Sequence, residues 1–269
     1  MIDVITFGCR LNAYESEVIR RSATEAGLTD AVIVNTCAVT AEAERQARQA
    51  IRKLRREQPD ATLIVTGCSA QITPERYAAM EEVDAVIGNQ EKLTARAFAE
   101  LDATPMVGDI MAVSETAGHL IEGFEGRSRA FLQIQNGCDH RCTFCIIPFG
   151  RGPSRSVSLP EILAQSTLLY ENGYREVVLT GVDIGDYGKD LQPRTGLADL
   201  VGELLGSLPG DMRVRITSID PVEVSDRMID LYARDTRLLP HWHLSVQSGD
   251  DMVLRRMARR HRRADVVAV

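Results

Sequence analysis

Short apolar segments typical of β-strands alternate with helix-like segments along most of the chain. In the first hundred residues, strands are predicted at 2–7, 31–35, 62–66 and 84–87, and helices at about 12–26, 40–57, from 74 onward and 90–101. Short, continuous apolar strands between helices are typical of a parallel sheet that is covered on both faces. The sequence therefore predicts an N-terminal parallel α/β domain, Rossmann-like or flavodoxin-like, over residues 1–101.

The same alternation begins again at Arg129, after a stretch without clear periodicity, 102–128, that is interpreted as a linker. Strands are predicted at 129–135, 176–180, 212–217 and 241–246, and helices at 158–172, 197–208, 224–233 and 250–260. These four β/α units predict a partial (β/α) barrel over residues 129–269. Because active sites of such barrels are built from the loops after the strands, Asp183, Asp220 and Gln247 are expected to face a common cavity.

Three cysteines follow three different strands of the N-terminal domain. Cys9, Cys37 and Cys68 each lie one or two residues past the end of a predicted strand. In open parallel sheets, ligands bind at that edge. A single cysteine at a strand end is usually a small buried apolar residue, but the same placement in three successive units predicts a metal site with three cysteine ligands.

The other three cysteines, Cys138, Cys142 and Cys145, follow the pattern CxxxCxxC directly after a predicted strand. Three thiolates are one ligand short of a tetrahedral zinc site or of the usual four-cysteine iron–sulfur cluster. The spacing leaves open a zinc with a ligand from elsewhere, a structural thiol cluster or disulfide, and a cluster with one iron left free for a ligand.

The composition and the N-terminal sequence indicate where the protein is located and how its cysteines are used. The N-terminus has no secretory signal and no apolar run is long enough for a membrane span, so we expect a cytoplasmic protein with no membrane partner. Six cysteines in such a chain indicate metal binding or catalysis rather than disulfides. A net charge of −7 argues against a protein that coats nucleic acid non-specifically.

Two basic stretches are candidates for phosphate contacts. The first lies on the helix predicted at 40–57, and the alternative of a solvated helix face stays open for it. The second lies on the helix predicted at 250–260 and just beyond it, where paired arginines four residues apart share a face, which favours phosphate binding. Its members are Arg255, Arg256, Arg259, Arg260, Arg262 and Arg263.

The CxxxCxxC pattern, with Phe144 before its last cysteine, resembles the radical S-adenosylmethionine motif. Together with segments 6–12, 34–37, 65–68, 88–89, 135–137, 179–187, 217–221 and 243–249, it makes the whole chain similar to the methylthiotransferase family of radical S-adenosylmethionine enzymes. The resemblance implies that the second domain is a radical S-adenosylmethionine barrel in which Cys138, Cys142 and Cys145 hold a 4Fe–4S cluster whose open iron binds S-adenosylmethionine. It also implies a second 4Fe–4S cluster on Cys9, Cys37 and Cys68, which carries the sulfur to be donated, and cofactor contacts from Phe144, Gly181, Asp183, Asp220 and Gln247.

Within this family, residues 8–12, 180–187 and 218–221 look most similar to the branch that acts on N6-threonylcarbamoyladenosine at position 37 of tRNA. That resemblance implies methylthio transfer to C2 of the adenine, recognition of the tRNA anticodon stem-loop, and an electron donor such as flavodoxin or ferredoxin. The branches that act on isopentenyladenosine or on a ribosomal protein aspartate are the close alternatives. Relatives of the threonylcarbamoyladenosine branch usually have a glutamate at the position of Asp220.

The family continues beyond position 269 with two more barrel strands and a small RNA-binding domain. We therefore expect the chain to be truncated at its C-terminus, and a non-catalytic, metal-stabilised fragment stays an open alternative.

Overall fold

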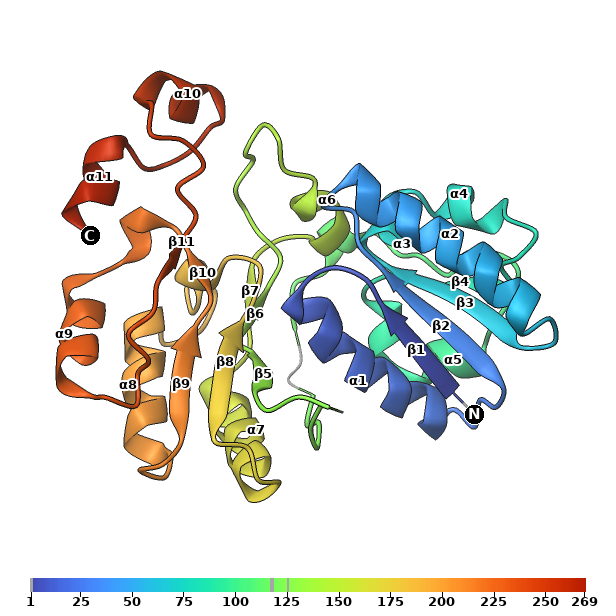
Figure 1. Cartoon of the computed structure of the whole chain (residues 1–269), viewed down its shortest axis with the longest axis horizontal. Coiled ribbons are helices and arrows are strands. Elements are labelled where there is room, and N and C mark those ends of the chain that lie inside the picture. The colour runs from blue at the N-terminus through green and yellow to red at the C-terminus, as the bar shows by residue number, and fades with distance from the viewer. Residues whose placement is uncertain (1, 117–118, 125) are drawn as a thin grey trace. The chain divides into compact units, whose positions relative to one another are not determined.

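The computed structural model describes residues 2–116, 119–124 and 126–269 (Figure 1). The chain divides into two compact units. The first consists of Met1–Val113 with Ile146–Pro153, and the second of Ser114–Cys145 with Ser154–Val269. The short segment that follows the CxxxCxxC cysteines therefore packs with the N-terminal half of the sequence.

The first unit is a parallel sheet with helices. Its strands, in the spatial order β1-β2-β3-β4, are β1 (Ile2–Thr6), β2 (Ala31–Thr36), β3 (Thr62–Gly67) and β4 (Ala85–Val86). Its α-helices are α1 (Arg10–Glu25), α2 (Ala41–Glu57), α3 (Cys68–Ile72), α4 (Pro74–Ala78), α5 (Ala95–Ala99) and α6 (Ile147–Arg151). Two 3-10 turns complete it, η1 (Glu91–Leu93) and η2 (Ile110–Ala112). The predicted parallel α/β architecture is confirmed.

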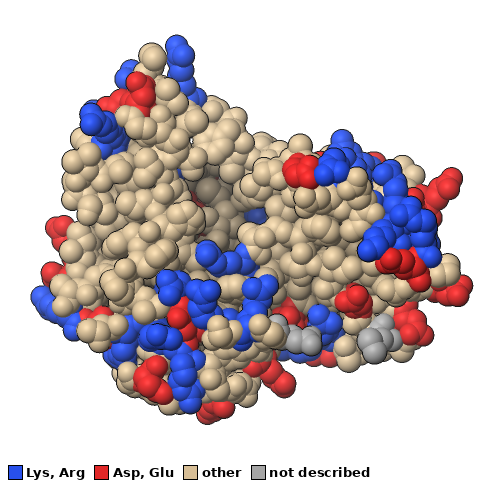
Figure 2. All heavy atoms as spheres, in the orientation of Figure 1, with Lys and Arg blue, Asp and Glu red and all other residues tan. Residues whose placement is uncertain are grey.

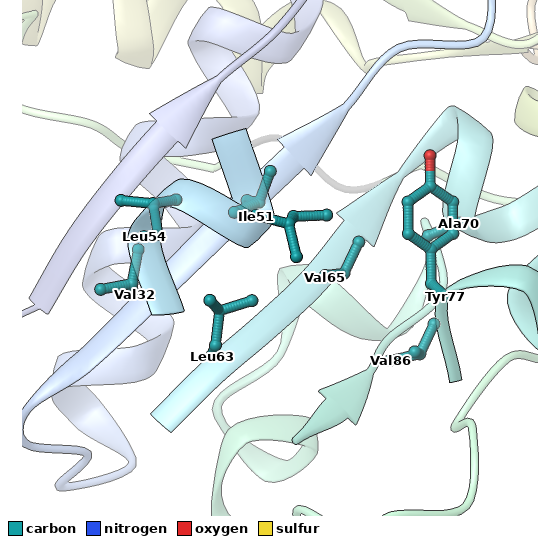
Figure 3. Packing of buried hydrophobic residues seen from close by; sticks show 9 residues of the cluster. Val32, Ile51, Leu54, Leu63, Val65, Ala70, Tyr77 and Val86 are labelled. Atoms are coloured by element: carbon teal, nitrogen blue, oxygen red, sulfur yellow. The ribbon is translucent and has the colours of Figure 1, made fainter. Parts of the chain in front are cut away.

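Both faces of this sheet are covered by apolar side chains from the helices. Because successive strand residues point to opposite faces, Val32 and Val34 pack with Ile51 of α2 and Tyr77 of α4 (Figure 3). Ile33, between them, packs on the other face with residues of α1 and α5. Two covered faces explain why the strands read as continuous apolar runs in the sequence.

The structure refines two helices expected in this unit. A short helix, α3, begins at Cys68 itself, ahead of the helix predicted from Pro74. The helix predicted at 90–101 is divided into η1 and α5 at Thr94, which has an extended backbone. Met106, from the predicted linker, forms a parallel bridge with Ile87 and extends the edge of the sheet. The predicted linker limits stay a prediction.

The second unit holds a parallel sheet of β5 (Ala130–Gln133), β8 (Glu176–Thr180) and β9 (Arg213–Ile216), in the order β5-β8-β9. A parallel pair joins β10 (Ser218–Ile219) and β11 (His243–Leu244), and an antiparallel pair joins β6 (Gln135–Asn136) and β7 (Arg155–Ser156). Its helices are α7 (Leu159–Glu171), α8 (Leu197–Ser207), α9 (Asp226–Arg234), α10 (Asp251–Arg256) and α11 (Arg263–Ala268), with 3-10 turns η3 (Ile184–Asp186) and η4 (Pro221–Glu223).

The third predicted strand of this unit is interrupted. Thr217 separates β9 from β10, and its hydroxyl donates to the carbonyl of Leu179 at 2.8 Å. The strand predicted at 241–246 is reduced to the two residues of β11, which pair with β10. The parallel strands therefore follow one another in sequence order, as in a partial barrel, but they are divided between the sheet β5-β8-β9 and the pair β10-β11.

The helix predicted at 250–260 ends early, and this overturns the expected arginine face. Helix α10 stops at Arg256, and Ala258 adopts a left-handed backbone with φ 55° that a regular helix cannot include. Arg259 and Arg260 therefore lie on a separate turn from Arg255 and Arg256. Both turn toward carboxylates of the same unit.

The basic stretch on α2 is also paired with acids. The basic stretch spans residues 45–56, and five of its cations form ion pairs with carboxylates outside that range. Figure 2 shows blue and red side chains next to one another over the α2 region. The pairs are Arg45–Glu42, Arg48–Glu44, Arg52–Glu82, Lys53–Glu57 and Arg55–Asp84. This pairing supports the solvated helix face over the phosphate-binding face.

Within the described part of the chain, no helix combines the length and the apolar character that crossing a membrane requires.

Candidate metal centres

The first unit brings Cys9, Cys37 and Cys68 to one edge of its sheet. Cys9 precedes α1, Cys37 follows β2, and Cys68 is the first residue of α3. The parallel register pairs Thr6 with Asn35 and Thr36 with Gly67, so the three strand ends are neighbours. Cys37 and Cys68 are buried, whereas Cys9 is exposed.

Glycine makes this close approach possible. Gly8 and Gly67 both have positive φ angles, 100° and 97°. A side chain at Gly8 would place its Cβ 2.7 Å from the sulfur of Cys37, and one at Gly67 would come within 2.3 Å of the Thr36 carbonyl oxygen. Each glycine directly precedes a cysteine, so the Gly-Cys pairs let the ends of β1 and β3 close on the end of β2.

The three thiols affect one another electrostatically. Burial raises the pKa of Cys37, and the proximity of Cys68 and Cys9 raises it further, against a backbone N–H donated by Val39 at 3.5 Å. Cys37 is therefore a neutral thiol in the metal-free site. A soft cation would have to displace its proton, which couples metal binding to proton release.

Buried polar side chains contact the sulfur of Cys68. The Nε of Arg151 donates to the sulfur of Cys68 at 3.0 Å, and its other nitrogens bind Glu15 and Asn12. The amide of Asn89 lies 3.7 Å from the same sulfur. Sequence reasoning did not single out these four residues as site residues, although Asn12 and Asn89 lie in or beside the segments that carry the resemblance.

In the second unit, Cys138, Cys142 and Cys145 lie on the loop that follows β6. All three are partly exposed. The backbone N–H of Cys145 donates to the carbonyl of Cys142 at 3.0 Å, which turns the loop back on itself. The guanidinium of Arg259 lies 3.6 Å from the sulfur of Cys142 and binds Asp220.

Gln135 fixes the start of this loop to the loop after β8. Its side-chain oxygen accepts the backbone N–H groups of Val182 and Asp183, both at 2.9 Å. Its amide nitrogen donates to the carbonyls of Asn136 and Gly137 and to the hydroxyl of Ser154. The side chain of Gln135 is fully buried, and its role was missed because a buried glutamine has no distinctive spacing in the sequence.

Asp183 belongs to an acidic group beside the cysteine loop. One ligand atom from each of its four members lies within 4.8 Å of the others, and the members are His140, Asp183, Asp186 and Glu223. Burial raises the pKa of Asp183 to about 7, and the neighbouring Glu223 and Asp186 contribute. His140 Nε2 lies 2.9 Å from Asp183 Oδ2 but is not aligned for a hydrogen bond.

Cations already neutralise this acidic group. Arg260 reaches Asp183 and Asp186 at 3.8 Å, Asp220 at 3.2 Å, and Glu223. Lys189 binds Asp186. Arg259 and Arg260, two of the six arginines that were expected to contact phosphate, therefore act as counter-ions within their own unit. Arg259 connects Asp220 to Cys142, and Arg260 connects Asp220 to Asp183.

The five residues predicted to contact the cofactor differ in their surroundings. Asp183 and Asp220 both lie beside Arg260, whereas Gln247 is exposed, with a left-handed backbone at φ 61°. The ring of Phe144 is also exposed. A Cβ at Gly181 would lie 2.9 Å from two oxygens of Gln135, so a glycine is required there for packing. Their roles toward S-adenosylmethionine stay predictions.

The donor sets suit soft metal centres. All six cysteines lie within the described residues, and each is a free thiol. Soft thiolates bind zinc and iron–sulfur clusters, and three of them leave one ligand position of either kind of site open.

Comparison with models of known protein families identifies the superfamily to which this chain belongs. A model described as "Radical SAM superfamily" matches residues 132–269, which include the CxxxCxxC loop, Asp183 and Asp220. A second model, described as "Uncharacterized protein family UPF0004", matches residues 1–88. The chain therefore belongs to the radical SAM superfamily.

Similar curated proteins narrow the comparison. The threonylcarbamoyladenosine tRNA methylthiotransferase MtaB of Rickettsia prowazekii is 53% identical over 265 residues, which cover 98% of this chain and 63% of that protein. The protein of the same name from Bacillus subtilis is 36% identical over 269 residues, which cover 95% and 59%. The chain thus spans about three fifths of the length of these relatives. The resemblance to methylthiotransferases is confirmed.

A solved structure shares the fold. The radical S-adenosylmethionine methyltransferase TsrM from Kitasatospora setae, with cobalamin and a [4Fe-4S] cluster bound, matches with a TM-score of 0.68 at 13% identity. The match covers 98% of this chain and 63% of that chain. At this identity the likeness concerns the fold alone.

Proposed function

We propose that this protein transfers a methylthio group to C2 of N6-threonylcarbamoyladenosine at position 37 of tRNA, with two 4Fe–4S clusters and S-adenosylmethionine. The observation that carries the proposal is the 53% identity to a relative named for that activity, over 98% of the chain. Cys138, Cys142 and Cys145 would hold the cluster that works with S-adenosylmethionine. Cys9, Cys37 and Cys68 would hold the second.

The chemistry explains why the chain would use such cofactors. When bound, the cluster and S-adenosylmethionine supply the radical that removes the C2 hydrogen of the adenine, a C–H bond that offers no acid–base handle. The residues of the chain prepare the site for this step. Gln135 joins the loop of Cys138 to the loop of Asp183 through its side-chain amide, and Arg259 holds Asp220 beside Cys142.

The substrate assignment follows the relatives. Those named for threonylcarbamoyladenosine are 35–53% identical to this chain, whereas a tRNA-2-methylthio-N(6)-dimethylallyladenosine synthase of Staphylococcus haemolyticus is 32% identical over 277 residues. The proposed partners are the tRNA anticodon stem-loop and a low-potential electron donor such as flavodoxin or ferredoxin. This activity also supports a cytoplasmic location.

Iron analysis tests the two clusters. After anaerobic reconstitution, the chain is expected to hold about eight irons, and about four after Cys→Ala replacement of either cysteine set. About four irons that disappear only with Cys138, Cys142 and Cys145 would leave one cluster. That result would remove the proposed sulfur donor.

Nucleoside analysis tests the substrate. Reconstituted chain is incubated with S-adenosylmethionine, a reductant and tRNA that carries N6-threonylcarbamoyladenosine, and the digested nucleosides are examined by mass spectrometry. The expected product has a methylthio group on that nucleoside, and it is absent with either Cys→Ala triple variant. Product formed only on tRNA that carries the dimethylallyl nucleoside would instead assign the chain to the other branch.

A further inference from the structure

A buried group of three charged residues lies under the cysteines of the first unit. The side chains of Glu15, Lys92 and Arg151 are 1%, 0% and 2% exposed. Lys92 Nζ donates to Glu15 at 2.7 Å, and Arg151 binds the other oxygen of the same carboxylate. The three therefore form one connected group within a single unit.

The carboxylate of Glu15 is ionised. Burial by itself would raise the pKa of Glu15, but Arg151 and Lys92 lower it below its usual value. Burial lowers the pKa of Lys92, against the neighbouring Glu15, which raises it. Buried ion groups contribute little to stability compared with apolar residues of similar volume. A contribution to stability therefore does not explain why charged side chains occupy this buried position.

The orientation of the Arg151 guanidinium indicates a role for these buried charges at the cysteine site. Glu15 and Asn12 fix two of its nitrogens, so the guanidinium plane has one orientation. The third nitrogen, Nε, donates to the sulfur of Cys68 at 3.0 Å. A rigid, planar and permanently charged donor is thus aimed at one of the three cysteines proposed to hold the second cluster.

Arg151 also reaches this site from a distant part of the sequence. Arg151 is the last residue of α6 and lies six positions beyond Cys145. This helix nevertheless belongs to the first unit. Asn89 joins the same segment by a hydrogen bond to the carbonyl of Gly150. Gly150 packs closely against the same cysteine, since a Cβ at this position would lie 3.2 Å from the Cβ of Cys68.

We propose that Arg151 is a positioning residue that sets the reduction potential of the cluster on Cys9, Cys37 and Cys68 through its hydrogen bond to the sulfur of Cys68. The inference rests on the proposed second cluster. Reduction adds negative charge to a cluster, and hydrogen bonds to its sulfurs stabilise that charge. Loss of the Arg151 donor therefore lowers the potential.

Two variants separate the hydrogen bond from the buried charge. Arg151→Lys keeps the cation but removes the planar donor fork. Arg151→Met leaves no donor on the side chain at position 151. Glu15 keeps Lys92 as its partner at 2.7 Å, so neither buried charge is left unpaired, which protects the fold. Arg52→Lys, on the exposed part of α2, is the matched control.

The measurement is a redox titration followed by electron paramagnetic resonance. All variants are made in the full chain with Cys138, Cys142 and Cys145 replaced by alanine, so that only the second cluster can load. We expect both variants to bind iron and to favour the reduced cluster about tenfold less, which is a shift of about −59 mV for one electron. The Arg52→Lys chain should keep the parent potential.

The possible failures are distinct. Loaded variants whose potential and spectrum equal those of the parent would overturn the role of Arg151 and leave the second cluster in place. A parent chain that binds no iron would overturn the second cluster, and the inference with it. Circular dichroism identifies a variant that fails to fold, and the other variant then decides the outcome.

Discussion

The carboxylate of Asp183 lies 3.7 Å from the sulfur of Cys138, the first cysteine of the CxxxCxxC loop. Burial, followed by the proximity of Asp183, raises the pKa of Cys138 to about 12. A thiol with that pKa is almost entirely protonated at neutral pH, so Asp183 restrains the reactivity of the metal-free loop.

Asp183→Asn should therefore make Cys138 more reactive. In a metal-free chain whose other five cysteines are alanine, removal of the carboxylate lowers the pKa of the thiol, and each unit raises the thiolate fraction roughly tenfold. We expect faster alkylation by iodoacetamide at pH 8. Asp139→Asn, which removes a carboxylate from the next position along the loop, should leave the rate unchanged. Equal rates in all three chains would show that Asp183 has no influence on the thiol.

The stability of the metal-free chain should depend on pH through Asp183. Its pKa is about 7 in the folded chain and 3.8 when unfolded. Between these values the folded chain keeps a proton that the unfolded chain has lost, so the free energy of unfolding falls as pH rises toward 7. The slope is at most about 1.4 kcal/mol per pH unit. Urea unfolding at several pH values should show a flatter profile for Asp183→Asn than for the parent chain, and an identical profile would contradict the assignment.

Gly67→Ala tests the close approach of the strand ends at Cys37 and Cys68. Gly27 provides the matched control, since it also has a positive φ, 75°, but a Cβ there meets nothing within 4 Å. Gly27→Ala should cost only the backbone strain, about 1 kcal/mol. Gly67→Ala adds a clash with the Thr36 backbone. We expect it to destabilise the chain by at least about 2 kcal/mol more, and to lower the iron held by Cys9, Cys37 and Cys68. Similar unfolding midpoints for the two variants would refute the packing argument.

The strands could be predicted closely because their signal is local. The predicted limits of β8 match the structure, and those of β2 differ by one residue. Helix ends were less certain, because tertiary contacts decide them. Ala258 has a high helix propensity, yet it takes a left-handed backbone that ends the turn after α10. No glycine or proline near Ala258 would allow the end of this helix to be predicted from the sequence.

The cysteines of the site could be predicted, but their charged neighbours could not. Cysteine spacing and placement after strands are visible in the sequence. Arg259 and Arg260 looked like part of a basic helix face, because their partners Asp220 and Glu223 lie more than 30 residues away. Arg151 and Glu15 are 136 residues apart. Such pairs depend on the fold, which composition and periodicity do not specify at this level.

Gln135 is the residue whose loss should most directly affect the CxxxCxxC loop. Gln135→Leu leaves the backbone N–H groups of Val182 and Asp183 without their acceptor, and the carbonyls of Asn136 and Gly137 without their donor. Each buried group left unpaired costs about 1–3 kcal/mol, so the two loops should separate rather than keep their native contact. We expect the iron bound by Cys138, Cys142 and Cys145 to be lost, measured in a chain whose other three cysteines are alanine.

Gln165→Leu is the control for that loss. Gln165 is also buried, and its amide binds the backbone N–H and carbonyl of Ile121, both at 2.8 Å, from α7. This substitution should lower the unfolding midpoint but leave the iron content of the folded chain intact, because Ile121 does not border the cysteine loop. Retention of full iron by Gln135→Leu, at a stability no lower than that of Gln165→Leu, would show that the loop does not need this amide to hold its cysteines.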